Sequence, residues 1–78
     1  MKGEYRMSNY EYGDTLYGTV TNCTMNGCFV RIDNAQPGEP NAYFHGYGQR
    51  NDRVMLSVIR SFPDQILTRL DSVREYAA

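Results

Sequence analysis

The sequence predicts an all-β domain, built as a small five-stranded antiparallel barrel. Five short segments alternate apolar and polar residues as half-buried strands do, and turn-forming residues separate them. An early hairpin carries a glycine on its inward side, and no long stretch has helical periodicity. With 78 residues the chain buries limited surface, and closing a sheet into a barrel uses few apolar residues efficiently.

The first strand is expected over residues 15–22. Leu16 and Val20 fall on the inward side, and Tyr17 falls on the outward side. Gly18 lies between the two core residues, where a missing side chain lets a strand coil or another backbone approach. We therefore expect the sheet to curve at this position.

The second strand is expected over residues 28–32, after a flexible turn at Asn26 and Gly27. Phe29 and Arg31 face outward by alternation and form a candidate contact pair. The inward residues are Cys28, Val30 and Ile32.

The third strand, residues 42–45, follows a loop over residues 33–41 that contains two prolines. With Phe44 inward, alternation turns Tyr43 and His45 outward.

Two further strands complete the domain, over residues 53–62 and 66–70, joined by a turn at residues 61–65. The longer strand places one apolar set on the core face: Val54, Leu56 and Val58. Its outer face is less polar than usual, with Met55, Ser57 and Ile59.

The chain is predicted to hold one domain between two short extensions. Residues 1–12 lack periodicity and carry three tyrosines, which is typical of a flexible leader. The domain is expected over residues 13–72, and residues 73–78 form a tail.

Composition excludes several classes of function. The net charge is -1 and the pI about 5.7, so a nucleic-acid site must be a local arrangement of the eight Lys and Arg residues. No apolar run reaches the roughly 20 residues of a membrane span, and the N-terminus lacks the apolar core of a signal peptide. We expect no membrane partner and a cytoplasmic location.

The cysteines and the histidine argue against a metal or a catalytic centre. Cys23, Cys28 and His45 are one ligand short of a structural zinc site, so reduced, partly buried thiols are the favoured interpretation. No nucleophile, carboxylate pair or phosphate-binding glycine loop is recognisable. The sequence therefore predicts a protein with no enzymatic activity, cofactor or metal.

Strand number and the glycine-bent hairpin favour a barrel of the OB type, with an SH3-like barrel as the alternative. Four motifs resemble the S1-type RNA-binding domain, a family of OB folds: GDTLYGTVT from Gly13, Gly27 with Phe29 and Val30, Phe44 with His45, and the alternating Asp52, Val54, Leu56 and Val58. The resemblance covers residues 13–70, and the step from Gly18 to Gly27 matches that family.

The resemblance implies single-stranded RNA lying across the outward face of the second and third strands. Phe29 matches the aromatic of the family's second strand, and His45 matches the histidine of its third. Tyr17 and Tyr43 extend this face by alternation, and Arg31 is suited to phosphate contact or to stacking. Further phosphate contacts are considered at Arg50, Arg53, Arg60 and Arg69.

The chain also departs from the family's pattern. Asn26 stands where a second aromatic is usual, and it can hydrogen-bond a base edge but cannot stack. Phe62 and Gln65 replace an acidic and a basic residue of the site, and the helical connection before the fourth strand is missing. The prediction is therefore a divergent member that binds single-stranded RNA, with single-stranded DNA left open. The alternative is a protein-interaction or regulatory domain that has lost part of the RNA site.

Overall fold

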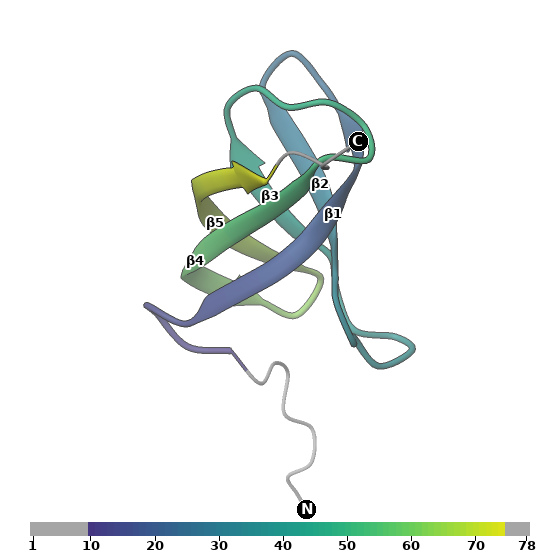
Figure 1. The fold of residues 1–78 in the computed structure, drawn as a ribbon. Helices are drawn as coiled ribbons and strands as arrows, with labels where there is room; N and C mark the ends of the chain where they lie inside the picture. The colour runs from purple at the N-terminus through teal and green to yellow at the C-terminus, as the bar shows by residue number, and fades with distance from the viewer. Residues whose placement is uncertain (1–9, 75–78) are drawn as a thin grey trace, which may run out of the picture.

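The computed structural model describes residues 10–74, which form five strands and no helix (Figure 1). The strands are β1 (Thr15–Cys23), β2 (Gly27–Ile32), β3 (Ala42–His45), β4 (Arg53–Phe62) and β5 (Gln65–Arg74). Each predicted strand is present. The fifth is longer than expected, since it continues to Arg74 in place of ending at Leu70. Within residues 10–74 no helix could cross a membrane.

The strands close into a barrel in the order β1, β2, β3, β5, β4, with β4 pairing back onto β1. The predicted small five-stranded all-β barrel is confirmed, but it is not antiparallel throughout, because β3 and β5 are parallel. A ring with an odd number of strands cannot alternate direction all the way round. Closure of five strands therefore requires at least one parallel pair, and β3 and β5 provide it.

The core contains the residues that alternation turned inward. Phe44, Leu56, Val20 and Val30 are fully buried. β5 adds Ile66 and the buried polar residue Thr68. This core fills the barrel and holds the outward side chains of β2 and β3 on a rigid base.

Gly18 allows the close strand approach that its position predicts. A Cβ atom there would lie 2.5 Å from both the Arg31 carbonyl oxygen and a Val30 methyl carbon. A register shift between Val20 and Asn22 follows in β1 and bends this strand further.

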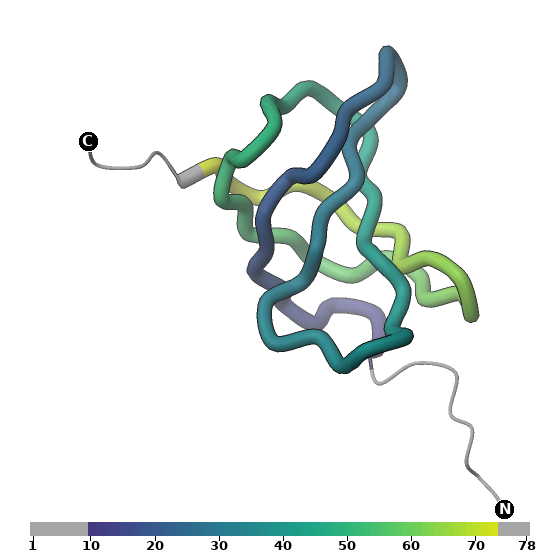
Figure 2. Tube along the Cα trace, turned by 90° about the vertical axis from the view of Figure 1, so that its right-hand side faces the viewer, coloured from purple at the N-terminus to yellow at the C-terminus, as the bar shows by residue number. Residues whose placement is uncertain are grey.

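The β1–β2 turn lies at one end of the barrel, and the connection over residues 33–41 lies at the other (Figure 2). In the turn, Thr24 Oγ1 accepts hydrogen bonds from the backbone amides of Asn26 and Gly27, at 3.1 and 3.3 Å. The Thr24 amide in turn donates to the Gly27 carbonyl at 2.7 Å. The hairpin end is thus held by its own local hydrogen bonds.

The two cysteines are joined as a disulfide, so the prediction of reduced thiols was wrong. The register of β1 and β2 makes Cys23 and Cys28 direct partners, and their Cα atoms are 4.1 Å apart. Sequence spacing alone could not supply that register. The pairing removes both thiolates as metal ligands, while Cys28 points inward as predicted.

The predicted leader lies mostly outside the described residues. Of its three tyrosines, Tyr10 packs against the core and Tyr12 is exposed, whereas Tyr5 is not described. Burial, together with the neighbouring Glu39 carboxylate, raises the pKa of Tyr10. The described part of this segment therefore contacts the barrel.

Candidate nucleic-acid interface

Three rings form a continuous aromatic strip on the outer face of β2 and β3. We define this strip as Phe29, Tyr43 and His45. The Phe29 and Tyr43 ring centroids are 5.0 Å apart, and those of Tyr43 and His45 are 5.2 Å apart. Phe29 and Tyr43 are direct cross-strand partners, and His45 lies two residues further along β3. The structure therefore brings both family-matched positions together, with Tyr43 as the ring that connects them.

The strip is partly sunk into the surface and remains open to solvent. Phe29 and Tyr43 are half-buried, and His45 is exposed. The planes of Phe29 and Tyr43 are tilted by 54°, and Tyr43 meets His45 edge-on at 87°. The three ring planes thus point in different directions on a rigid base. This arrangement suits several flat groups, each of which contacts one ring.

Gly27 supplies the space for the central ring. A Cβ atom at Gly27 would lie 2.6 Å from the Tyr43 hydroxyl and would also collide with the Phe44 carbonyl. The Tyr43 ring therefore lies over the backbone of β2 next to Phe29. Sequence reasoning assigned Gly27 only to the turn, although its pairing with His45 places it beside the strip.

Thr68 of β5 supports the strip from the opposite side. Its hydroxyl donates a hydrogen bond of 2.9 Å to the Tyr43 carbonyl, and its side chain is buried. The parallel register of β3 and β5 also places Leu67 directly beside Tyr43. Sequence reasoning missed this support because it did not predict that β5 lies beside β3.

Arg31 is the exposed cation on the same face of β2 as Phe29. It stands near Asp33, whose pKa is lowered chiefly by the hydrogen bonds from Arg53, and in smaller part by the charge of Arg31. Arg53 grips the Asp33 carboxylate with contacts of 2.8 and 2.6 Å and also donates to Thr19 at 3.0 Å. The Arg53 side chain therefore links β4 to β1 and to the end of β2. Arg31 is better placed than Arg53 to contact a ligand on the strip.

Of the other predicted site residues, Tyr17 stands apart from the strip and Asn26 lies at one end of it. Tyr17 is exposed on β1, pairs with Met55 of β4 and lines a surface hollow with Arg53. It is five positions along β1 from Asn22, the partner of Phe29, which corresponds to about 16 Å of strand. Asn26 lies in the exposed β1–β2 turn, next to Gly27 at the His45 end of the strip.

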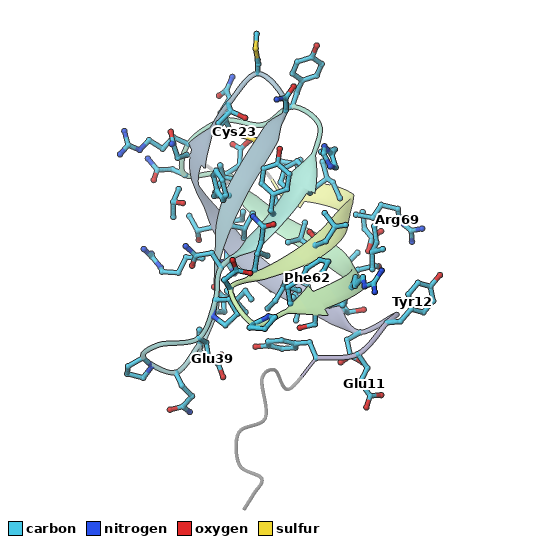
Figure 3. All side chains as sticks on the ribbon, turned by 180° about the vertical axis from the view of Figure 1, so that it is seen from behind. Glu11, Tyr12, Cys23, Glu39, Phe62 and Arg69 are labelled. Atoms are coloured by element: carbon cyan, nitrogen blue, oxygen red, sulfur yellow. A yellow bond between two sulfur atoms is a disulfide. The ribbon has the colours of Figure 1, made fainter. Side chains whose placement is uncertain are left out.

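The remaining basic candidates have partners of their own or lie in a loop. Arg69 contacts Asp71 at 3.4 Å, and the Arg60 guanidinium lies 5.5 Å from the centroid of the Phe62 ring. Figure 3 shows Phe62 and Arg69 well below Cys23, which marks the end of the barrel at the β1–β2 turn. Arg50 is exposed in the connection between β3 and β4.

Solved structures of other proteins share the barrel, and three of them illustrate the likeness. The chain aligns over 78% of its length with a chain of the a/eIF2alpha–aDim2p–rRNA complex from Pyrococcus horikoshii OT3, at 21% identity and a TM-score of 0.65. It aligns over 80% with GSP13 from Bacillus subtilis, at 21% identity and a TM-score of 0.66. It aligns over 88% with the intact alpha subunit of aIF2 from Pyrococcus abyssi, at 23% identity and a TM-score of 0.65.

These likenesses confirm the OB-type barrel that the resemblance to S1-type domains implied. The chain spans 44%, 56% and 30% of the three matched chains, so it corresponds to one part of each. No protein-family model and no curated protein sequence matches the chain significantly.

Proposed function

We propose that this chain is a noncatalytic module that binds single-stranded RNA across the outer faces of β2 and β3. The observation that carries the proposal is the aromatic strip, in which Phe29, Tyr43 and His45 follow one another at 5.0 and 5.2 Å on a rigid sheet. One of the solved structures with this barrel is a complex that contains rRNA. The likeness supports the same class of ligand here.

Stacking supplies most of the proposed affinity. An exposed ring on a rigid strand stacks on an unpaired base for about 1–3 kcal/mol, without requiring a particular base. Phe29 and His45 are the main stacking groups, and Tyr43 between them holds both rings in place and adds its own edge. Because every base has an aromatic face, we expect weak sequence preference.

Charge plays a local role. Arg31 lies on the same strand face as Phe29 and is the proposed phosphate contact. Asn26, at the other end of the strip, is the proposed hydrogen-bonding partner of a base edge. With a net charge of -1, the chain has no general attraction for polyanions, so binding depends on these neighbours of the strip.

The proposal is tested by fluorescence anisotropy with a labelled single-stranded RNA of mixed sequence at low salt. Phe29→Ala should weaken binding by about 1–3 kcal/mol, because one stacking ring is lost. Tyr17→Ala is the matched control, since it removes an exposed ring from β1 outside the strip. The RNA affinity of the Tyr17→Ala variant should equal that of the unmodified chain.

The same assay separates the proposal from its alternatives. A single-stranded DNA of the same sequence tests whether the 2′-hydroxyl contributes to binding. No binding of either nucleic acid at low salt would reject the proposed function and would leave a protein-interaction domain as the better interpretation. Equal losses from Phe29→Ala and Tyr17→Ala would show that the strip is not the binding surface.

A further inference from the structure

The Cys23–Cys28 pair lies directly beside the aromatic strip. Cys28 comes between Gly27, which makes room for Tyr43, and Phe29, the first ring of the strip. On the facing strand its partner is Phe44, which lies between Tyr43 and His45. A covalent change at Cys28 therefore occurs next to Phe29 in the chain and opposite the residue that separates Tyr43 from His45.

The surroundings of the sulfur atoms suit both oxidation states. The Gly48 carbonyl oxygen lies 3.4 Å from Cys23 Sγ, and the Gly46 carbonyl oxygen lies 4.0 Å from Cys28 Sγ. A disulfide has no hydrogen to donate, but two thiols do, and these carbonyls are in place to accept from them. Reduction thus leaves no buried thiol facing only apolar groups.

The two cysteines differ in their exposure. Cys23 is half-buried, whereas Cys28 is fully buried. Gly48, which touches the pair, also lines a surface hollow together with Tyr47, Gln49 and Asp52. We therefore expect a small reagent to react first at Cys23, the more exposed residue of the pair.

We propose that Cys23 and Cys28 are a reversible redox pair, and that the disulfide strengthens RNA binding by fixing the Phe29 end of the strip. This inference rests on the proposed function. Without the disulfide, the last residues of β1 and the first residues of β2 are held together only by the backbone pairing of the two strands and by the hydrogen bonds of Thr24 in the turn. Phe29 then has more freedom, which must be lost on binding.

The oxidant in this proposal is a small-molecule disulfide such as oxidised glutathione. The Cys23 thiolate attacks one of its sulfurs, forms a mixed disulfide and releases one small thiol. The Cys28 thiolate then attacks the Cys23 sulfur and releases the second. The chain gives up two electrons and two protons, and these appear in the two molecules of small thiol.

The test measures RNA affinity of the full chain in reduced and in oxidised glutathione buffers. Alkylation of free thiols followed by mass measurement reports the oxidation state, and thermal unfolding confirms that both forms are folded. We expect the oxidised form to bind the labelled single-stranded RNA roughly three- to tenfold more tightly, because fewer side-chain conformations are lost on binding. Cys23→Ser/Cys28→Ala should bind like the reduced chain in both buffers.

Each contrary result has a distinct meaning. Equal affinity in the two buffers, or thiols that stay free at every glutathione ratio, would overturn this inference and leave the proposed function standing. A redox response that persists in the double variant would overturn it as well. No binding in either buffer would overturn the proposed function, and this inference with it.

Discussion

At Gly27, the backbone of β2 passes so close to the Tyr43 phenol that no side chain fits between them. The central ring of the strip therefore depends on a residue with no side chain. The glycine shapes the surface by leaving room for a larger neighbour. The proposed binding surface thus includes a residue that has no side chain with which to contact a ligand.

Gly27→Ala tests this dependence. The added methyl group meets the Tyr43 hydroxyl and the Phe44 carbonyl, so the ring or the strand must shift. We expect the free energy of unfolding to fall by about 2–3 kcal/mol. RNA affinity should fall as well. Chemical denaturation and anisotropy measure the two effects.

Gly38→Ala is the control for that substitution. Gly38 has a positive φ of 91°, but a methyl group added there would meet nothing within 4 Å. Its substitution carries only the backbone penalty of about 1–2 kcal/mol and should leave RNA affinity unchanged. A loss of affinity in Gly38→Ala equal to that in Gly27→Ala would contradict the steric argument.

Asp33 and Arg53 give a pH-dependent contribution to stability. The hydrogen bonds from Arg53 hold the pKa of Asp33 below its usual value. The pair therefore stabilises the folded chain above the unfolded pKa of about 3.9, and this contribution is lost as the pH falls through the folded value. Because both side chains are about one third exposed, at 31% and 37%, we expect less than about 1 kcal/mol at pH 7.

The measurement is thermal unfolding of Asp33→Asn and of the unmodified chain, from pH 7 down to pH 2. The difference between them should be present at pH 7 and should vanish in acid. Asp64→Asn, in the exposed β4–β5 turn, is the control and should differ little at either pH. A difference for Asp33→Asn that stays constant down to pH 2 would argue against the ion pair.

At the scale of elements, β5 joins the site through its parallel pairing with β3. Thr68→Val removes the hydrogen bond to the Tyr43 carbonyl while keeping the shape of the side chain. We expect a loss of about 1–2 kcal/mol in the free energy of unfolding, since the hydroxyl is buried and bonded. Denaturant titration measures it.

Thr68→Ser separates the hydrogen bond from packing. It keeps the hydroxyl group and loses only a methyl group, so the carbonyl-carbon resonance of Tyr43, which accepts the hydrogen bond, should move less in Thr68→Ser than in Thr68→Val. A larger shift in the serine variant would mean that packing, and not the hydrogen bond, positions β3 on β5.

The strands were predictable because the signal for each lies within a few neighbouring residues. Alternation placed Leu16, Val20 and Phe44 in the core and turned Phe29 outward, and the structure agrees. The pairing of β3 with β5 was not predictable in this way. Alternation with a period of two residues indicates which side chains face inward, but it does not indicate which strand lies alongside. The disulfide was missed for the same reason, because it depends on the register of β1 with β2.

The residues of the candidate site were predictable to different degrees for the same reason. Alternation and the family resemblance pointed to Phe29, Tyr43 and His45, and the structure brings these rings together. Tyr17 was predicted to extend the same surface because it also faces outward. On a closed barrel, however, outward positions point in all directions, and Tyr17 faces solvent beside β4.

At the scale of the whole molecule, a single proposed phosphate contact, Arg31, predicts a shallow salt dependence of RNA binding. Each phosphate contact to a single strand contributes a slope of about -0.7 in a plot of log K against log salt. With Arg31 as the main phosphate contact, we expect a total slope of about -0.7 to -1.4. Anisotropy titrations over a range of KCl concentrations measure it.

Arg31→Gln should reduce that slope by about 0.7, whereas Arg31→Lys keeps the charge and should preserve it. A steep slope that is unchanged in Arg31→Gln would show that phosphates are held by other side chains. It would then direct attention to Arg50, Arg60 and Arg69.

Closure of the ring also bears on how the chain behaves at high concentration. Each of the five strands in the described part of the chain has a neighbour on both sides, but β3 pairs with β5 only up to Thr68, and residues 69–74 of β5 pair with β4 alone. That short stretch is where strand addition by a second molecule is expected to begin. Where strands are paired on both sides, fibril growth must first separate two bonded strands.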